Sequence, residues 1–169
     1  MSSHNYSLSG HGYHLKDIAK GVNGEISKIE EELFELHDAN EQKSKIMALV
    51  ELSDLIGAIE LYVDKYHQKL SEIIPFELNS LIKIQTNDHV LKSSNFRGTL
   101  DEIKTQLDFM KEYHKFNKFS KQINPISNIL IIISLYLKNN YPNFNFNDLV
   151  VMKDITKRTF ENGHRISSS

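Results

Sequence analysis

The chain has 169 residues, which suits one domain with a sizeable core. Charged residues make up 25% and hydrophobic residues 40%, the composition of an ordinary soluble globular protein. A net charge of −2 excludes a bulk basic field for nucleic acid, and the lack of cysteine excludes disulfides and thiolate zinc sites. The start has no apolar signal segment, and the longest apolar run, 129–137, is shorter than the roughly 20 residues of a membrane span. We therefore expect a cytoplasmic protein without membrane partners.

The first half of the chain predicts a tail and two long helices. Residues 1–12 are polar and rich in Ser, His and Gly, so we expect a flexible tail before a single domain over 13–166. Apolar residues at helical spacing predict a helix over 26–41. A second helix is expected over 43–70, and apolar residues cover most of its circumference.

The second half predicts three further helices after a polar loop at 88–98, over 99–120, 126–138 and 148–161. Thr99 and Glu102 form a capping-box pattern at the start of the first, and Pro125 precedes the second. Asn145 or Asn147 is expected to cap the third. No alternating strand pattern stands out, so the predicted fold class is all-α.

Two pairs of acids mark the first two predicted helices. At about 100° per residue, Glu32 and Glu35 lie together along one flank of the apolar stripe, whereas Glu31 falls nearly opposite it and should face water. Glu51 and Asp54 project from the narrow sector that the apolar residues of the second helix leave. Ionised carboxylates in such a setting cost several kcal/mol each unless a partner compensates them.

A cation is one such partner. The short connection near 40–44 favours antiparallel packing of the two helices, which lets the two pairs of acids face each other. Oxygen ligands without His or Cys suit a hard cation, with Mg²⁺ first and Mn²⁺ as an alternative. The structural alternative, which spacing alone leaves open, is that Lys or Arg from another helix pairs with Glu51 and Asp54.

The same residues resemble the MazG-like family of all-α nucleoside triphosphate pyrophosphatases. The family pattern Glu-x-x-Glu followed by Glu-x-x-Asp is similar to Glu32-Leu33-Phe34-Glu35 and Glu51-Leu52-Ser53-Asp54, within the stretches EELFEL and ELSDLIGAIE. The segment MKDITKRTFENGHR resembles the closing helix of phage-type members. The resemblance covers about residues 25–65 and, more loosely, 148–165.

The resemblance implies a helical bundle, dimeric or tetrameric, that hydrolyses a (deoxy)nucleoside triphosphate to the monophosphate and pyrophosphate. It implies that Glu32, Glu35, Glu51 and Asp54 hold Mg²⁺, and that Glu35 or Glu32 also serves as general base. It further implies a role in controlling or cleaning the nucleotide pool, and the phage-type closing helix favours deoxyribonucleotides.

A triphosphate also needs cationic side chains. We expect Lys153, Lys157 and Arg158 on the last helix, and Lys28 beside the acids, to contact phosphate. The ordinary alternative for each is a solvated basic surface.

Other signals are weaker. Lysines and aromatic residues alternate over 111–121, which suits single-stranded nucleic acid, but at helical spacing the aromatic residues are better explained as core. His14 lies beside the tail, and the histidines as a set do not share a face at ligand spacing, so no histidine site is predicted. No phosphate-binding loop of the Gly-x-x-x-x-Gly-Lys type occurs.

Two alternatives to the nucleotide hydrolase remain at this point. One is a helical adaptor or regulatory protein whose acids are surface charges. The other is a pyrophosphohydrolase for a different phosphorylated metabolite, such as a phosphoribosyl nucleotide.

Overall fold

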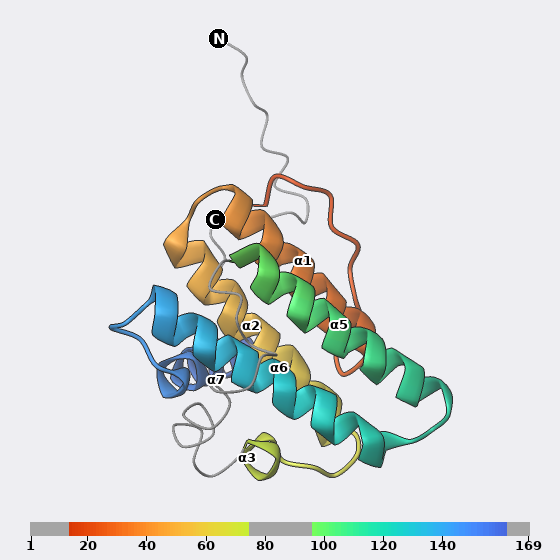
Figure 1. Cartoon of the computed structure of the whole chain (residues 1–169). Coiled ribbons are helices and arrows are strands. Elements are labelled where there is room, and N and C mark those ends of the chain that lie inside the picture. The colour runs from red at the N-terminus through yellow and green to blue at the C-terminus, as the bar shows by residue number, and fades with distance from the viewer. Residues whose placement is uncertain (1–13, 75–95, 162–169) are drawn as a thin grey trace.

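The computed structural model describes residues 14–74 and 96–161, with side chains at 14–74 and 97–156. These residues form helices and no strand, which confirms the all-α prediction (Figure 1). The helices are α1 (Ile26–Glu41), α2 (Lys45–Asp64), α3 (Leu70–Ile73), α5 (Phe96–Lys115), α6 (Phe119–Asn140) and α7 (Phe146–Glu161). The predicted tail at 1–12 and most of the predicted loop at 88–98 lie outside the described residues.

Helices α1 and α2 form an antiparallel hairpin, as the short connection predicts (Figure 1). The α1 bounds match the predicted 26–41, but α2 is shorter than the predicted 43–70. It begins at Lys45 because the Ser44 side chain accepts a hydrogen bond from the Met47 amide (3.2 Å). It ends at Asp64, where His67 takes a left-handed conformation (φ 57°) and its amide donates to the Asp64 carbonyl (3.0 Å).

Helices α5 and α6 form a second antiparallel hairpin, and here the predicted boundaries are wrong. The helix predicted to reach Ser120 ends at Lys115, because Asn117 is left-handed (φ 53°) and turns the chain. The next helix begins at Phe119, so Pro125 lies inside α6 rather than before it. α5 also begins at Phe96, earlier than the capping-box pattern at Thr99 predicts.

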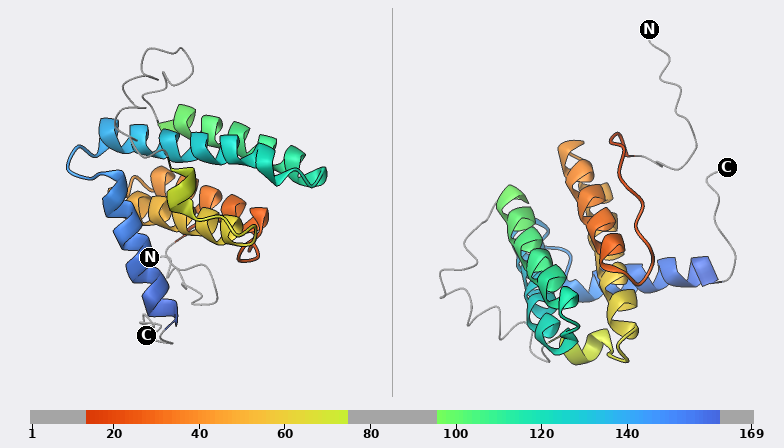
Figure 2. Two further views of the ribbon diagram at one scale, coloured as in Figure 1. Left: turned by 90° about the horizontal axis from the view of Figure 1, so that it is seen from below. Right: turned by 90° about the vertical axis from the view of Figure 1, so that its right-hand side faces the viewer.

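The two hairpins stack as layers, with α7 crossing at a steep angle (Figure 2). Buried residues of α2 and α6 supply the centre of the core, and the unbroken buried run Ile129–Leu137 of α6 accounts for the apolar stretch in the sequence. Helix α7 packs on α2 and begins at Phe146, where the Asn145 side chain accepts from the Asp148 amide (3.0 Å). Asn145, one of the two predicted caps, is therefore the residue used.

Residues 14–25, here called the N-terminal strap, run alongside α1 before the helix begins (Figures 1 and 2). A turn closed by the Glu25 amide on the Val22 carbonyl (3.0 Å) carries the strap into α1. Gly24 has φ +80° in this turn, a conformation that glycine adopts without strain. The strap thus places its side chains along one face of α1.

Among the described residues, no helix is both long enough and apolar enough to cross a membrane.

Candidate metal centre

The two acids of α2 lie where that helix faces α1. Glu51 is 1% exposed and Asp54 is partly buried, on a helix whose other sides are filled by residues such as Leu52, Leu55 and Ile56. The exposed residues of α2 lie near its ends, at Lys45, Ile46, Leu61 and Asp64, so the middle of the helix offers a carboxylate little contact with solvent. The fold therefore holds both charges close to the α1–α2 interface.

The two predicted acids of α1 meet them there. Carboxylate oxygens of Glu32, Glu51 and Asp54 lie within 4.8 Å of one another. Glu35 joins the same region, since its carboxylate lies within 4.8 Å of ligand atoms of Glu31 and Glu32, and of Glu51. The structure thus brings together all four acids that the sequence singles out.

The environment of Glu32 is the most informative part of the cluster. Its side chain is 6% exposed, and Oε1 pairs with Lys28 Nζ at 2.7 Å. Its Oε2 is buried and has no hydrogen-bond partner among the described residues. A buried carboxylate oxygen without a donor is unfavourable, so it marks a place where a cation or a donor would bind.

The pKa values of the carboxyl groups in the cluster also favour a bound cation. Burial raises the pKa of Glu32 to about 8. The charges of Glu35 and Asp54 add to this increase, whereas the pairing with Lys28 opposes it. Burial, followed by the charge of Glu35, raises the pKa of Asp54 to about 6. Both carboxyl groups resist ionisation in the metal-free protein, and a divalent cation would stabilise their ionised form.

The strap adds a histidine to this cluster, which the sequence analysis did not predict. His14 Nε2 lies 3.2 Å from Glu51 Oε1 and 3.8 Å from Glu35 Oε2. Its Nδ1 lies 3.0 Å from Asp38 Oδ2, which also accepts from the Leu15 amide (3.1 Å) and from Gln42 Nε2 (2.8 Å). The sequence pattern of the histidines, considered only as a set, did not place His14 beside these acids.

The strap also overturns the expectation that Glu31 faces water. Glu31 is 2% exposed and accepts from the Gly21 amide (2.6 Å) and from Lys20 (3.2 Å), while Lys28 pairs with it at 3.0 Å. Burial acts to raise the pKa of Glu31, but these donors outweigh burial and hold the pKa below its ordinary value. Glu31 is buried because the strap covers it, which spacing along α1 alone did not predict.

The strap approaches α1 closely at Gly21. A Cβ at this position would lie 2.3 Å from the Ser27 carbonyl oxygen and 2.4 Å from the Lys28 amide nitrogen, both backbone atoms. Only glycine fits there without moving the strap or the helix start.

We expect Glu31→Gln to loosen the strap and to lower the free energy of unfolding by about 1–2 kcal/mol, because charge-assisted hydrogen bonds from Lys20 and Lys28 are lost. Urea unfolding measures the change. Glu112→Gln, an exposed acid of α5 paired with Lys115, is the control and should stay within about 0.5 kcal/mol. A Glu31→Gln protein as stable as this control would contradict the described role of Glu31.

The predicted phosphate-binding cations separate into three groups. Lys28 lies in the cluster, between Glu31 and Glu32. Lys153 is 7% exposed and pairs with Glu60 and Asp154, with its stem against Gly57. The side chains of Lys157 and Arg158 lie outside the described residues. Lys20, which the sequence analysis did not single out, pairs with Glu31 and Glu35 (3.7 Å) and is 61% exposed.

We expect Lys153→Ala to lower the free energy of unfolding by about 2–3 kcal/mol, since it leaves Glu60 at the α2–α7 contact without this lysine. Lys115→Ala, which removes an exposed partner of Glu112, is the control and should cost less than about 0.5 kcal/mol. Urea unfolding of both variants measures these changes in the free energy of unfolding. If Lys153→Ala leaves stability unchanged but raises KM for a nucleotide, Lys153 contacts phosphate and does not anchor α7.

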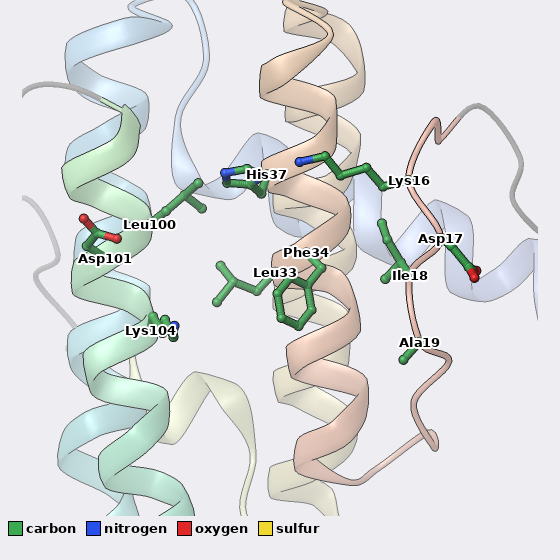
Figure 3. Close-up of a pocket in the computed structure, with 10 residues that line it drawn as sticks. All are labelled: Lys16, Asp17, Ile18, Ala19, Leu33, Phe34, His37, Leu100, Asp101 and Lys104. Atoms are coloured by element: carbon green, nitrogen blue, oxygen red, sulfur yellow. The ribbon is translucent and has the colours of Figure 1, made fainter.

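A pocket of about 510 Å³ lies on another side of α1. Figure 3 shows Leu33, Phe34 and His37 of α1 between Leu100, Asp101 and Lys104 of α5 and the strap residues Lys16–Ala19. Its lining is apolar at the centre with charges of both signs around it, and it includes none of the four acids. It is therefore a separate feature from the acidic cluster, although the strap borders both.

Comparison of the chain with protein-family models, with curated proteins and with solved structures gives no significant match. The assignment of a function therefore rests on the residues and geometry described above.

Proposed function

We propose that this protein is a Mg²⁺-dependent hydrolase that cleaves a nucleoside triphosphate into the monophosphate and pyrophosphate. The observation that carries the proposal is that oxygens of Glu32, Glu51 and Asp54 lie within 4.8 Å of one another, and that the buried Glu32 Oε2 has no donor in the described part of the chain. A donor set of carboxylate oxygens suits Mg²⁺, with Mn²⁺ as an alternative. We take Glu32, Glu35, Glu51 and Asp54 as the metal ligands.

A bound Mg²⁺ would neutralise charge on phosphate oxygens and lower the pKa of a water. Glu35 suits the role of general base, because its side chain is 13% exposed and its carboxylate lies near both Glu51 of α2 and His14 of the strap. Glu32 is the alternative base. Its raised pKa means that it holds a proton near neutral pH until a cation is bound.

Lys28 is the best-placed predicted contact for the phosphate chain. Its side chain is 22% exposed and its ammonium group already lies 2.7 Å from Glu32. Negative charge that develops on phosphate oxygens beside the cation would attract the Lys28 ammonium group to the substrate. Lys20 approaches the cluster from the strap, where its ammonium group lies 3.2 Å from Glu31 and 3.7 Å from Glu35. The phosphate contacts of Lys153, Lys157 and Arg158 remain predictions of the sequence.

A nucleotide panel tests the proposal. Wild-type protein is incubated with Mg²⁺ and each of the common ribo- and deoxyribonucleoside triphosphates, and nucleotide and pyrophosphate products are separated by ion-exchange chromatography. We expect monophosphate and pyrophosphate in equal amounts, with deoxyribonucleotides preferred. Release of inorganic phosphate with the diphosphate instead would contradict the proposed bond cleavage. Including a phosphoribosyl nucleotide tests the alternative substrate class.

The non-catalytic adaptor is separated from the enzyme by thermal melting with Mg²⁺ and a nonhydrolysable deoxynucleoside triphosphate. The enzyme proposal expects both to stabilise the wild-type protein and neither to stabilise Glu51→Gln. An adaptor whose acids are surface charges would show no shift with either.

We further propose that the enzyme forms a homodimer or homotetramer and acts on the free nucleotide pool of the cytoplasm, as a phage or bacterial pool-controlling enzyme would. Helix α7 supports the oligomer, since Val151 and Ile155, one turn apart, are 56% and 59% exposed. Light scattering coupled to size exclusion should give at least twice the 19.6 kDa chain mass, and Ile155→Asp should lower it. A wild-type monomer at micromolar concentration would contradict this part.

A further inference from the structure

We propose that His14 of the N-terminal strap is a nitrogen ligand of a second cation position, formed by His14, Glu35 and Glu51 and selective for transition metals such as Mn²⁺ over Mg²⁺. This inference rests on the proposed function, because it shares Glu51 with the all-oxygen position of Glu32, Glu51 and Asp54. It makes the strap part of the site.

The spacing of the donor atoms fits one ion. Two neighbouring ligands that each lie about 2.1–2.3 Å from a metal are about 3.0–3.3 Å apart in octahedral geometry. His14 Nε2 and Glu51 Oε1 are separated by 3.2 Å, and Glu35 Oε2 lies 3.8 Å from the same nitrogen. All three residues offer ligand atoms within 4.8 Å of one another, so only a small movement of Glu35 is needed to close the set.

The orientation of the imidazole fits a ligand as well. Asp38 Oδ2 lies 3.0 Å from His14 Nδ1 and is itself fixed by the Leu15 amide and by Gln42. A carboxylate that accepts from Nδ1 leaves the Nε2 lone pair directed at the opposite side, which is the arrangement usual for metal-binding histidines. Here that side carries Glu35 and Glu51.

The contact between His14 and Glu51 is buried, so solvent does not screen the charges of these two side chains. The His14 side chain is 8% exposed and the Glu51 side chain 2%. When Nδ1 donates to Asp38, an Nε2 lone pair 3.2 Å from a carboxylate oxygen is repulsive unless Nε2 is protonated or both atoms bind the same cation. An imidazole and two carboxylates suit Mn²⁺, Co²⁺ or Zn²⁺ better than Mg²⁺.

The test uses the full chain, freed of metal and titrated with Mn²⁺, with free ion counted by electron paramagnetic resonance. We expect two ions per wild-type chain, and in His14→Ala we expect loss of one ion or at least about tenfold weaker binding of it. Spin-echo modulation should show a ¹⁴N coupling to Mn²⁺ in the wild type and none in His14→Ala. One ion per wild-type chain, or no nitrogen coupling, would overturn the inference.

Two control variants separate a lost ligand from a loosened strap. His37→Ala removes a histidine of α1 that pairs with Glu41 outside the cluster, and it should match the wild type. Lys20→Ala removes strap contacts to Glu31 and Glu35 but leaves the imidazole, so we expect it to retain the nitrogen coupling. If Lys20→Ala loses the second ion as completely as His14→Ala, docking of the strap explains the loss and the inference fails.

The outcome is independent of the nucleotide assay. Two bound ions with nitrogen coupling, but no pyrophosphate from any nucleotide, would support the inference and reject the proposed function. Pyrophosphate release with unchanged Mn²⁺ binding in His14→Ala would do the reverse.

Discussion

Glu51→Gln is expected to lower the rate of pyrophosphate release by at least about 100-fold, because it removes a ligand common to both proposed cation positions. The amide keeps the size of the side chain, so the protein should still fold. Without metal its melting temperature should equal or exceed that of the wild type, since one buried carboxylate is removed from a cluster of like charges.

Steady-state assays of purified protein measure this effect, with Glu112→Gln on the exposed face of α5 as the matched substitution. Asp54→Asn and Glu32→Gln should behave like Glu51→Gln. A Glu51→Gln enzyme within about threefold of the wild-type rate would exclude Glu51 as a metal ligand.

Stability of the metal-free protein is expected to fall as pH rises from about 5 to 8.5. The pKa of Glu32 is about 8 and that of Asp54 about 6 in the folded protein, above their ordinary values of 4.5 and 3.8. The folded state therefore binds more protons than the unfolded state in this window, and the stability associated with those protons is lost as pH rises through the folded pKa values. The loss should be of the order of 2–4 kcal/mol, or about 5–10 °C in Tm.

Thermal melts across this pH range, with and without Mg²⁺, measure the loss. Mg²⁺ competes with protons for the same carboxylates, so it should raise Tm more at pH 8.5 than at pH 6. Glu32→Gln should flatten the metal-free profile, whereas Glu112→Gln should not. A wild-type profile that rises toward pH 8.5 without metal would show that Glu32 and Asp54 ionise freely.

The sequence was sufficient to predict the α1–α2 hairpin and its acids because both depend on local periodicity. A helix apolar on nearly every side leaves one direction for Glu51 and Asp54, and the short connection fixes which face of α1 lies opposite. The structure confirms that these acids meet Glu32 and Glu35. Binding of a metal there stays a prediction.

The strap was not predictable in this way. Residues 14–25 have no helical or alternating pattern, so nothing local indicates that they return along α1. Their contacts bury Glu31 and bring His14 to Glu51 across a long sequence separation. In retrospect the one signal is that Glu31, Glu35 and Asp38 are spaced to share one face of α1, and an acidic face of this kind favours basic partners.

The helix boundaries near 115–125 failed for a different reason. The aromatic and lysine pattern continues across Asn117, and only the left-handed backbone of that residue ends α5. Pro125 suggested a helix start, but α6 begins six residues earlier, at Phe119, and continues through the proline, although proline has no amide to donate inside the helix. The aromatic residues of this region do not all belong to the core: Phe119 stacks on Tyr66, whereas Phe116 is 64% exposed.

The central claim is that carboxylates of α1 and α2 converge because a divalent cation binds among them. Isothermal titration calorimetry of the metal-free protein with Mg²⁺ at pH 8 tests it most directly, with wild type and Glu51→Gln side by side. We predict saturable binding to the wild type and none to Glu51→Gln. Equal heats from both proteins, or no binding to either, would contradict it.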